Sequence, residues 1–268
     1  MNRIDAAFEQ LRATNQKAFV AYVCAGDPDL ETTLEIVRVL ESCGVDIVEL
    51  GLPFSDPLAD GIVNQMAAGR ALDAGATTVG VLETVRKIRE FSQIPLVLFT
   101  YLNPVYAYGF EKFHVDASAA GADGVLLLDL PADEQICNAE LPQQHNLRRI
   151  GLIAPTTPPE RAKKIAAQAE GFIYYISREG VTGAQTSLVD NLAEQSAAIM
   201  AVSSVPVCVG FGISTPEQAA AVTAAADGVV VGSAIVNVIA RHGKDADLAE
   251  KLTAFVRPLV AAAKGLEG

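Results

Sequence analysis

The 268-residue sequence is poor in aromatic and in basic residues. It contains no Trp and 6% aromatic residues, and its 20 Lys and Arg stand against 32 Asp and Glu, so the formal net charge is −12. A surface with this excess of acid repels the phosphates of nucleic acids and of anionic membranes. We therefore expect a small molecule or another protein as the partner, and neither nucleic acid nor a membrane.

The sequence also lacks the spacings that indicate a metal centre, a redox pair or export. Its four Cys residues form no C-x-x-C pair, so neither a zinc site nor a redox pair is indicated. No run reaches the roughly 18 apolar residues of a membrane span, and the N-terminal segment has no apolar core of a signal peptide. These absences predict a cytoplasmic protein with reduced thiols.

Eight short, continuous apolar runs recur along the chain, separated by helix-length segments rich in Ala, Leu, Glu and Gln. Continuous rather than alternating runs are typical of parallel strands covered on both faces. Eight such units favour a (β/α)8 TIM barrel, a single domain over residues 1–268, above an open doubly wound sheet. We expect an extra N-terminal helix to cap one end of the barrel. The predicted strands are residues 19–24, 47–50, 96–100, 124–128, 149–153, 172–176, 206–209 and 228–231.

Three of these strands lie within similar sequence segments, which are CGVDIVELG, AGADGVLLLD and AAADGVVVGS. In each, a small residue or Gly ends a helix, and an Asp (Asp46, Asp123 or Asp227) occupies the turn before the strand. The likeness is that of repeated βα units rather than of a short solenoid repeat.

The stretch richest in polar residues follows the second predicted strand, and barrel active sites lie at the carboxyl ends of strands. Glu49 stands inside the apolar run itself. Burial there would raise the pKa of its carboxyl toward neutrality and suit it to proton transfer. A buried Glu paired with an Arg is an equally simple interpretation, and the sequence leaves both open.

Two further acids, Asp56 and Asp60, lie in the loop after this strand, which is rich in Pro and Gly. Asp60 directly precedes a helix candidate that starts near Ile62, so helix capping is the simpler explanation for Asp60 taken alone. The alternating oxygen ligands of a calcium loop are absent.

Glycines follow the seventh and eighth predicted strands, at Gly210, Gly212 and Gly232, and Ser233 then begins a helix. Such turns together with helix N–H groups form the phosphate cradle of many barrels, although glycines also serve plain turns. After the sixth strand, residues 177–184 are polar and contain Gly, which is typical of a mobile lid or of an ordinary surface loop.

Aromatic side chains gather at the predicted strand ends. They suit either an apolar pocket for a flat ring or an ordinary core. No Lys falls inside a predicted strand and the three His residues are isolated, so Schiff-base, metal and His-base chemistry lack support. By elimination, carboxylates would carry any acid–base work. The aromatic residues are Tyr22, Phe99, Tyr101, Tyr174 and Phe211.

Several motifs, in order along nearly the whole chain, resemble the tryptophan synthase alpha chain family. The most specific is ELGLPFSDPLADG, and the others are GDPD, YLNPVY, SREGVTG, GFGIS and VGSAIV. The resemblance implies a TIM-barrel lyase, without a cofactor of its own, that cleaves indole-3-glycerol phosphate to indole and glyceraldehyde 3-phosphate by a retro-aldol step.

The resemblance also implies residue roles. Glu49 would transfer protons at indole C3 and at the glycerol hydroxyl, and Asp60 would stabilise charge at the indole N–H. Thr182, in the lid, would meet Asp60 on closure. The indole and glycerol pocket would be lined by Tyr22, Phe99, Tyr101, Leu126, Tyr174 and Phe211, and the phosphate would be held by Gly183, Gly210, Gly212, Gly232 and Ser233.

The implied assembly is an αββα complex, in which indole passes to a beta chain that carries pyridoxal phosphate (PLP). Asp56 and Asn103 fall where the alpha chain would face this partner. Cys24 and Tyr22 depart from the usual Thr and Phe, and we expect them to tune the pocket. The alternatives are another phosphate-binding barrel isomerase or synthase, and a non-catalytic regulatory barrel subunit; the pairing of Glu49 with Asp60 counts against both.

Overall fold

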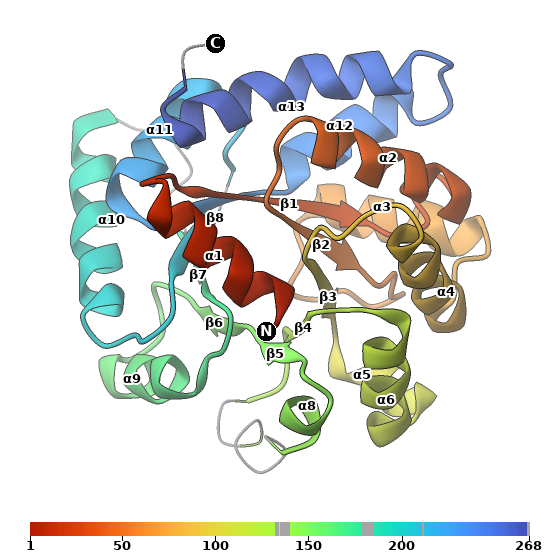
Figure 1. Cartoon of the computed structure of the whole chain (residues 1–268), viewed down its shortest axis with the longest axis horizontal. Helices are drawn as coiled ribbons and strands as arrows, with labels where there is room; N and C mark the ends of the chain where they lie inside the picture. Colours follow the sequence, from red (N-terminus) through yellow and green to blue (C-terminus); the bar gives the residue numbers. More distant parts are fainter. Residues whose placement is uncertain (132–133, 135–139, 178–184, 211, 267–268) are drawn as a thin grey trace.

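The apolar runs form one parallel sheet that curls into a nearly closed barrel (Figure 1). The computed structural model describes residues 1–131, 134, 140–177, 185–210 and 212–266, with only the backbone described over 185–191. The order of the described strands in the sheet is β5-β4-β3-β2-β1-β9-β8-β7-β6. The barrel prediction is therefore confirmed. The strands are β1 (Ala18–Cys24), β2 (Ile47–Gly51), β3 (Leu96–Thr100), β4 (Gly124–Leu127), β5 (Arg148–Arg149), β6 (Gly151–Ile153), β7 (Ile173–Ile176), β8 (Val207–Gly210) and β9 (Gly228–Val231).

The fifth predicted strand, residues 149–153, is divided in two at Ile150. Its first part, β5, pairs with β4, and its second part, β6, pairs with β7. The Ile150 N–H donates to the Val125 carbonyl at 3.1 Å, whereas the Gly151 N–H donates to the Phe172 carbonyl at 3.3 Å. This one segment therefore serves both ends of the sheet, so that the eight predicted and nine observed strands describe the same barrel.

Helices follow the strands and cover the outer face of the sheet (Figure 1). Side-chain oxygens cap several of them: Asp29 accepts from the Thr32 N–H, and Thr77 accepts from the Gly80 N–H. The described helices are α1 (Arg3–Ala13), α2 (Leu30–Ser42), α3 (Ile62–Asp73), α4 (Thr78–Arg89), α5 (Leu102–Tyr108), α6 (Phe110–Ala120), α8 (Glu140–Gln144), α9 (Pro159–Gln168), α10 (Gln185–Met200), α11 (Pro216–Ala225), α12 (Ser233–His242) and α13 (Leu248–Lys264).

The apolar side chains form two cores, one between the sheet and the helices and one inside the barrel. The inner core includes Val20, Ile47 and Val97 from neighbouring strands. Helix α1 adds Ile4, Phe8 and Leu11 to it, and it lies across the strands in Figure 1. The expected N-terminal helix therefore closes the end of the barrel at which the strands begin.

The three turn aspartates each bind the neighbouring strand. The carboxylate of Asp46 accepts from the Phe19 N–H at 2.8 Å, that of Asp123 from the Leu96 N–H at 2.9 Å, and that of Asp227 from the Val207 N–H at 2.9 Å. In every case the donor lies at or next to the first residue of the strand that pairs with the strand after the Asp. In each of the three similar segments, the Asp therefore holds the first residues of the neighbouring strand in place.

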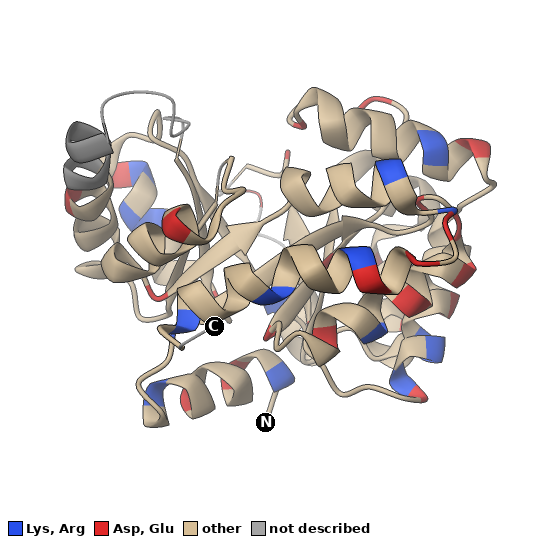
Figure 2. Cartoon of the chain, turned by 90° about the horizontal axis from the view of Figure 1, so that it is seen from above, with Lys and Arg blue, Asp and Glu red and all other residues tan. Residues whose placement is uncertain are grey.

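Charged residues are spread over the outer helices and loops with both signs interspersed (Figure 2). Within the part of the chain that the structure describes, no helix is long and apolar enough to cross a membrane.

Candidate active site

A cavity of about 350 Å³ opens at the carboxyl ends of the strands. It collects side chains and turns from β1, β2, β3, β6, β7 and β9 and from the loop after β2, at the place where barrels carry their active sites. Of the predicted site residues, those that line it are Tyr22, Glu49, Asp60, Phe99, Tyr174, Gly212, Gly232 and Ser233.

Glu49 is the buried acid of this cavity. Its place in the middle of β2, in register with Tyr22 on β1 and Val97 on β3, leaves its side chain fully buried. Neither carboxyl oxygen has a hydrogen-bond partner, and no cation of the described chain pairs with it. Among the residues that the structure describes, no Arg is therefore paired with Glu49, which counts against the interpretation as an Arg-paired structural Glu. Burial alone raises the pKa of the Glu49 carboxyl to about 8, because no donor or cation offsets the loss of water.

Asp60 is the second acid and lies at the mouth of the cavity. Its carboxylate accepts from the Tyr101 hydroxyl at 2.8 Å and from the Asn64 side-chain amide at 3.4 Å. Burial raises the pKa of Asp60, and these two hydrogen bonds partly oppose the rise. Helix α3 begins at Ile62 as predicted, but its N-cap is Gly61 without a side-chain cap, so the capping interpretation of Asp60 is wrong.

Tyr101 stands behind Asp60. Its hydroxyl donates to the Asp60 carboxylate and accepts from the Ala59 N–H at 3.0 Å, so it fixes both the acid and the loop that carries it. Neither Tyr101 nor the fully buried Leu126 is among the residues that line the cavity. Tyr101 is thus placed to position Asp60 rather than to form the wall.

The aromatic wall is built on β1 and β3. Tyr22 and Phe99 meet edge to face with ring centroids 4.9 Å apart. The Tyr22 ring and hydroxyl occupy the space above Gly51, where an added Cβ would collide with both. The neighbouring Cys24 is buried in the inner core behind this wall, and burial raises the pKa of its thiol, which disfavours the reactive thiolate.

Glycines at the ends of β8 and β9 form the opposite rim. Gly232 is the N-cap of α12, and both Gly232 and Ser233 line the cavity, so this helix turns the positive end of its dipole toward it. Gly212 has a φ of +64°, which favours glycine. Gly210 makes room for Tyr174, because a Cβ at Gly210 would lie 2.7 Å from the Tyr174 ring.

Three of the predicted site residues, Thr182, Gly183 and Phe211, lie outside the described residues. Asp56 and Asn103, the expected partner contacts, are both exposed. Among the described residues, no group of three or more His, Cys, Asp or Glu side chains is arranged to hold a metal ion.

Asn64 and several apolar residues also line the cavity, and the sequence did not predict them. Asn64 follows Asp60 by four positions and stands in the first turn of α3, a spacing that could have indicated the contact. No local signal marks the apolar residues, since their place in the cavity depends on the closure of the barrel. They are Ile62, Val63, Leu128, Leu152, Ile176 and Val230.

Residues 8–264 match the family model described as tryptophan synthase alpha chain. The chain belongs to the tryptophan synthase alpha chain family. It is 49% identical to the tryptophan synthase alpha chain of Opitutus terrae, over 98% of this chain and all of that protein. It is 48% identical to the one of Geobacter sulfurreducens, over 97% of this chain and 98% of that protein. The crystal structure of tryptophan synthase subunit alpha from Legionella pneumophila is similar with a TM-score of 0.90 at 39% identity, covering 98% of each chain.

Proposed function

We propose that Glu49 and Asp60 carry out the cleavage catalysed by this tryptophan synthase alpha chain. The family fixes the reaction: a lyase subunit cleaves indole-3-glycerol phosphate to indole and glyceraldehyde 3-phosphate in tryptophan biosynthesis. The observation that carries the proposal is the unpartnered Glu49 carboxyl, buried in the same cavity as Asp60. A buried acid with no partner is costly, and it is retained here where a proton is needed.

The first step is protonation of indole C3 by Glu49. The raised pKa keeps the Glu49 carboxyl protonated near neutrality, so it can act as a general acid. Protonation at C3 develops positive charge toward the ring nitrogen, where the N–H donates to the Asp60 carboxylate. An anion held there by Tyr101 and Asn64 stabilises the charge as it forms.

The second step breaks the bond between C3 and the first glycerol carbon. Glu49, now ionised, takes the proton of the hydroxyl on that carbon, and the O–H electrons form the aldehyde carbonyl. The electrons of the broken carbon–carbon bond return to the ring and neutralise the nitrogen. Atoms and charge balance without a cofactor in this chain, and Glu49 ends protonated as it began.

Each part of the substrate contacts a different wall of the cavity. Tyr22 and Phe99 offer an edge-to-face wall for the indole ring, and Tyr174 lies near the glycerol chain. The phosphate is bound by Gly212, Gly232 and Ser233 at the start of α12, together with Gly183. We retain Phe211 as a pocket residue and Thr182 as the lid contact of Asp60, as the motifs imply.

The partner is a tryptophan synthase beta chain, and the working enzyme is an α2β2 heterotetramer in the cytoplasm. PLP belongs to the beta chain, which consumes the indole. Asp56 and Asn103 contact this partner, and Leu58, two positions after Asp56 and 93% exposed, adds an apolar side chain to the contact. Residues 1–268 act as one catalytic domain, since all described strands join a single sheet.

The direct test is an assay of indole release from indole-3-glycerol phosphate by the purified chain, with and without added beta chain. We expect indole and glyceraldehyde 3-phosphate in equal amounts. An isomerase would convert the substrate without releasing indole, and a regulatory barrel would leave it intact, so either result would reject the proposal.

A further inference from the structure

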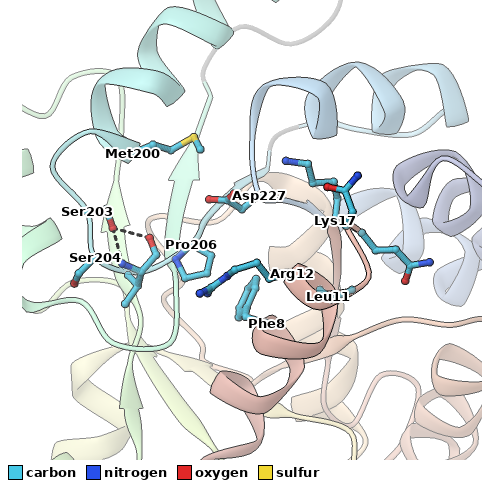
Figure 3. Close-up of a pocket in the computed structure, with 12 residues that line it drawn as sticks. Phe8, Leu11, Arg12, Lys17, Met200, Ser203, Ser204, Pro206 and Asp227 are labelled. Carbon is cyan, nitrogen blue, oxygen red and sulfur yellow. Dashed lines mark hydrogen bonds between the residues drawn. The ribbon is translucent and has the colours of Figure 1, made fainter.

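A second cavity, of about 420 Å³, lies at the opposite end of the barrel. Three segments that precede strands form it: residues 8–17 before β1, residues 200–206 before β8, and Asp227 before β9 (Figure 3). The catalytic cavity lies at the other ends of these strands. Neither the proposed reaction nor the expected beta-chain contacts involve these residues, so the cavity has no role in the function described so far.

Charges of both signs border this cavity without neutralising each other. Arg12 extends from α1 across it toward Pro206, Lys17 stands at its edge, and Asp227 faces it from the strand side (Figure 3). Within the described chain, neither cation makes an ion pair or a side-chain hydrogen bond, and the Asp227 carboxylate accepts only from the Val207 N–H, through one oxygen. Two unpaired cations and a carboxylate around one cavity leave charges of both signs available to a ligand.

Apolar side chains form the remaining wall. Phe8 and Leu11 are each 6% exposed and anchored in the inner core, and Phe8 packs on Phe172 with ring centroids 5.9 Å apart. Across the cavity stand Pro206 and Met200, which is 39% exposed. This wall would accommodate an apolar group of a ligand.

The cavity is preformed. The Ser203 hydroxyl donates to the Val205 carbonyl at 2.7 Å and accepts from the Val205 N–H at 3.1 Å, which folds the loop on itself (Figure 3). The hydrogen bond from Val207 fixes the Asp227 carboxylate. A ligand would therefore meet walls that need little ordering, which lowers the free-energy cost of binding.

We propose that this cavity binds a small zwitterion of the α-amino-acid class with an apolar side chain. The ligand carboxylate pairs with Arg12, aided by Lys17, its ammonium group pairs with Asp227, and its side chain packs on Phe8 and Met200. A purely anionic ligand would face Asp227 unpaired, and a purely cationic one would face Arg12 and Lys17. The volume falls in the usual range of about 300 to 1,000 Å³ for small-molecule sites.

The test is isothermal titration calorimetry of the full chain with L-leucine, which lacks an indole ring that would seek the active site. Isoamylamine lacks the carboxylate of leucine, and 4-methylpentanoate lacks its ammonium group. We expect saturable binding of one leucine per chain, and at least tenfold weaker binding of either analogue.

Two charge-removing variants and one matched control locate the site. Arg12→Gln and Asp227→Asn should weaken leucine binding at least tenfold; the Asn side chain can still accept from the Val207 N–H, so the strand contact is kept. Arg161→Gln removes a cation from the exposed surface of α9 and should leave binding unchanged. Circular dichroism melting of all three variants checks that the fold is intact.

Four results would overturn the proposal. The first three are no saturable binding of leucine, binding that survives both charge removals in folded protein, and equal affinity for an analogue with only one charge. Leucine that indole displaces in direct competition would be bound in the active site and would count equally against the proposal.

Discussion

The burial of Glu49 lowers the stability of the folded chain and, at the same time, gives the site a proton donor. A carboxyl with no hydrogen-bond partner in a fully buried position destabilises the folded chain whenever it is ionised. The same burial gives an acid that stays protonated near neutrality. The buried Glu49 carboxyl therefore lowers the stability of the folded chain at the position where the reaction needs a proton.

This cost predicts a pH dependence of stability. Because the pKa of Glu49 is higher in the folded chain, at about 8, than its ordinary 4.5, the folded state holds the proton over a range in which the unfolded state has lost it. The Glu49 contribution is therefore fully favourable below about pH 4.5 and is lost as the pH rises through 8. The total loss is on the order of 5 kcal/mol.

The measurement compares urea unfolding of the wild type and of Glu49→Gln between pH 5 and 9. The neutral amide cannot ionise, so we expect the variant to gain stability over the wild type as the pH rises. Parallel curves for the two proteins would show that the carboxyl does not titrate in this range.

Tyr101 predicts a shift in the pH dependence of activity. Its hydroxyl donates to Asp60 and so favours the ionised form, and Tyr101→Phe should raise the pKa of Asp60. Since Asp60 acts as an anion, the acid limb of kcat should move to higher pH, with a loss of about tenfold at neutral pH. Tyr108→Phe is the matched control, because the Tyr108 hydroxyl also donates to a carboxylate, that of Asp116, but on the surface. An acid limb that stays in place in Tyr101→Phe would contradict this role.

For single residues, the sequence predicts which side chains belong to the site better than it predicts the groups that contact them. Glu49 was placed inside a strand because its neighbours are apolar, but whether an Arg reaches it depends on side chains distant in the sequence. For Asp60, the local helix signal favoured a cap, whereas the barrel brings Tyr101, forty-one positions away, onto its carboxylate.

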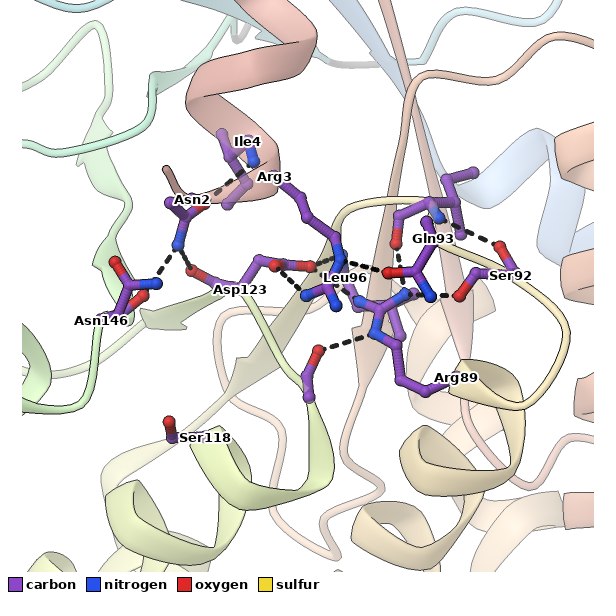
Figure 4. A network of polar contacts seen from close by, with 12 residues as sticks. Asn2, Arg3, Ile4, Arg89, Ser92, Gln93, Leu96, Ser118, Asp123 and Asn146 are labelled. Carbon is purple, nitrogen blue, oxygen red and sulfur yellow. Dashed lines mark hydrogen bonds and ion pairs between the residues drawn. The ribbon is translucent and has the colours of Figure 1, made fainter.

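At the scale of the elements, hydrogen bonds and ion pairs hold the turn before β4 to its neighbours. Asp123 accepts from Arg3, Arg89 and the Leu96 N–H, at 2.9, 2.7 and 2.9 Å, and Figure 4 shows these contacts converging on the turn before β4. The Asn2 amide also donates to the Asp123 carbonyl at 2.8 Å. One turn therefore joins α1, α4, β3 and β4.

Asp123→Ala should accordingly destabilise the chain by about 3 kcal/mol or more, because it leaves the Arg89 side chain, only 11% exposed, without its carboxylate. Urea unfolding at pH 7 measures the change. Asp116→Ala breaks the exposed pair with Lys112 and should leave the free energy of unfolding nearly unchanged, because solvent screens that pair. Equal, small losses for the two variants would show that the network does not stabilise the turn.

The elements themselves were largely predictable. Runs such as residues 96–100 and 228–231 are continuous and apolar because both faces of the strand are covered, and they appear as β3 and β9 with the predicted bounds. The division of residues 149–153 was not predictable, since it depends on two different neighbours in the closed sheet and not on composition.

For the molecule as a whole, the net charge of −12 is compatible with a phosphate substrate. Helix N–H groups and Gly turns at Gly232 and Ser233 act at contact distance, whereas carboxylates on the outer helices are screened over about 8 to 10 Å. The net charge therefore disfavours nucleic acids and anionic membranes as partners. The glycine rim at Gly232 and Ser233 determines whether a small anion binds.

The barrel also keeps its two ends distinct. The carboxyl ends of the strands carry the two acids and the glycine rim, and the amino ends carry α1, the turn aspartates and the second cavity. This division is the usual one for barrels, in which one end serves chemistry and the other serves stability. Changes at Glu49 should thus affect the reaction without unfolding the protein.

The most direct test of the account is the rate of indole release by Glu49→Gln. Glutamine keeps the shape of the side chain but has no proton to give or take, so we predict kcat at least about 10³-fold below that of the wild type. The circular dichroism spectrum and the binding of glycerol phosphate should be unchanged. Indole release at a near-normal rate by the folded variant would contradict the central role of Glu49.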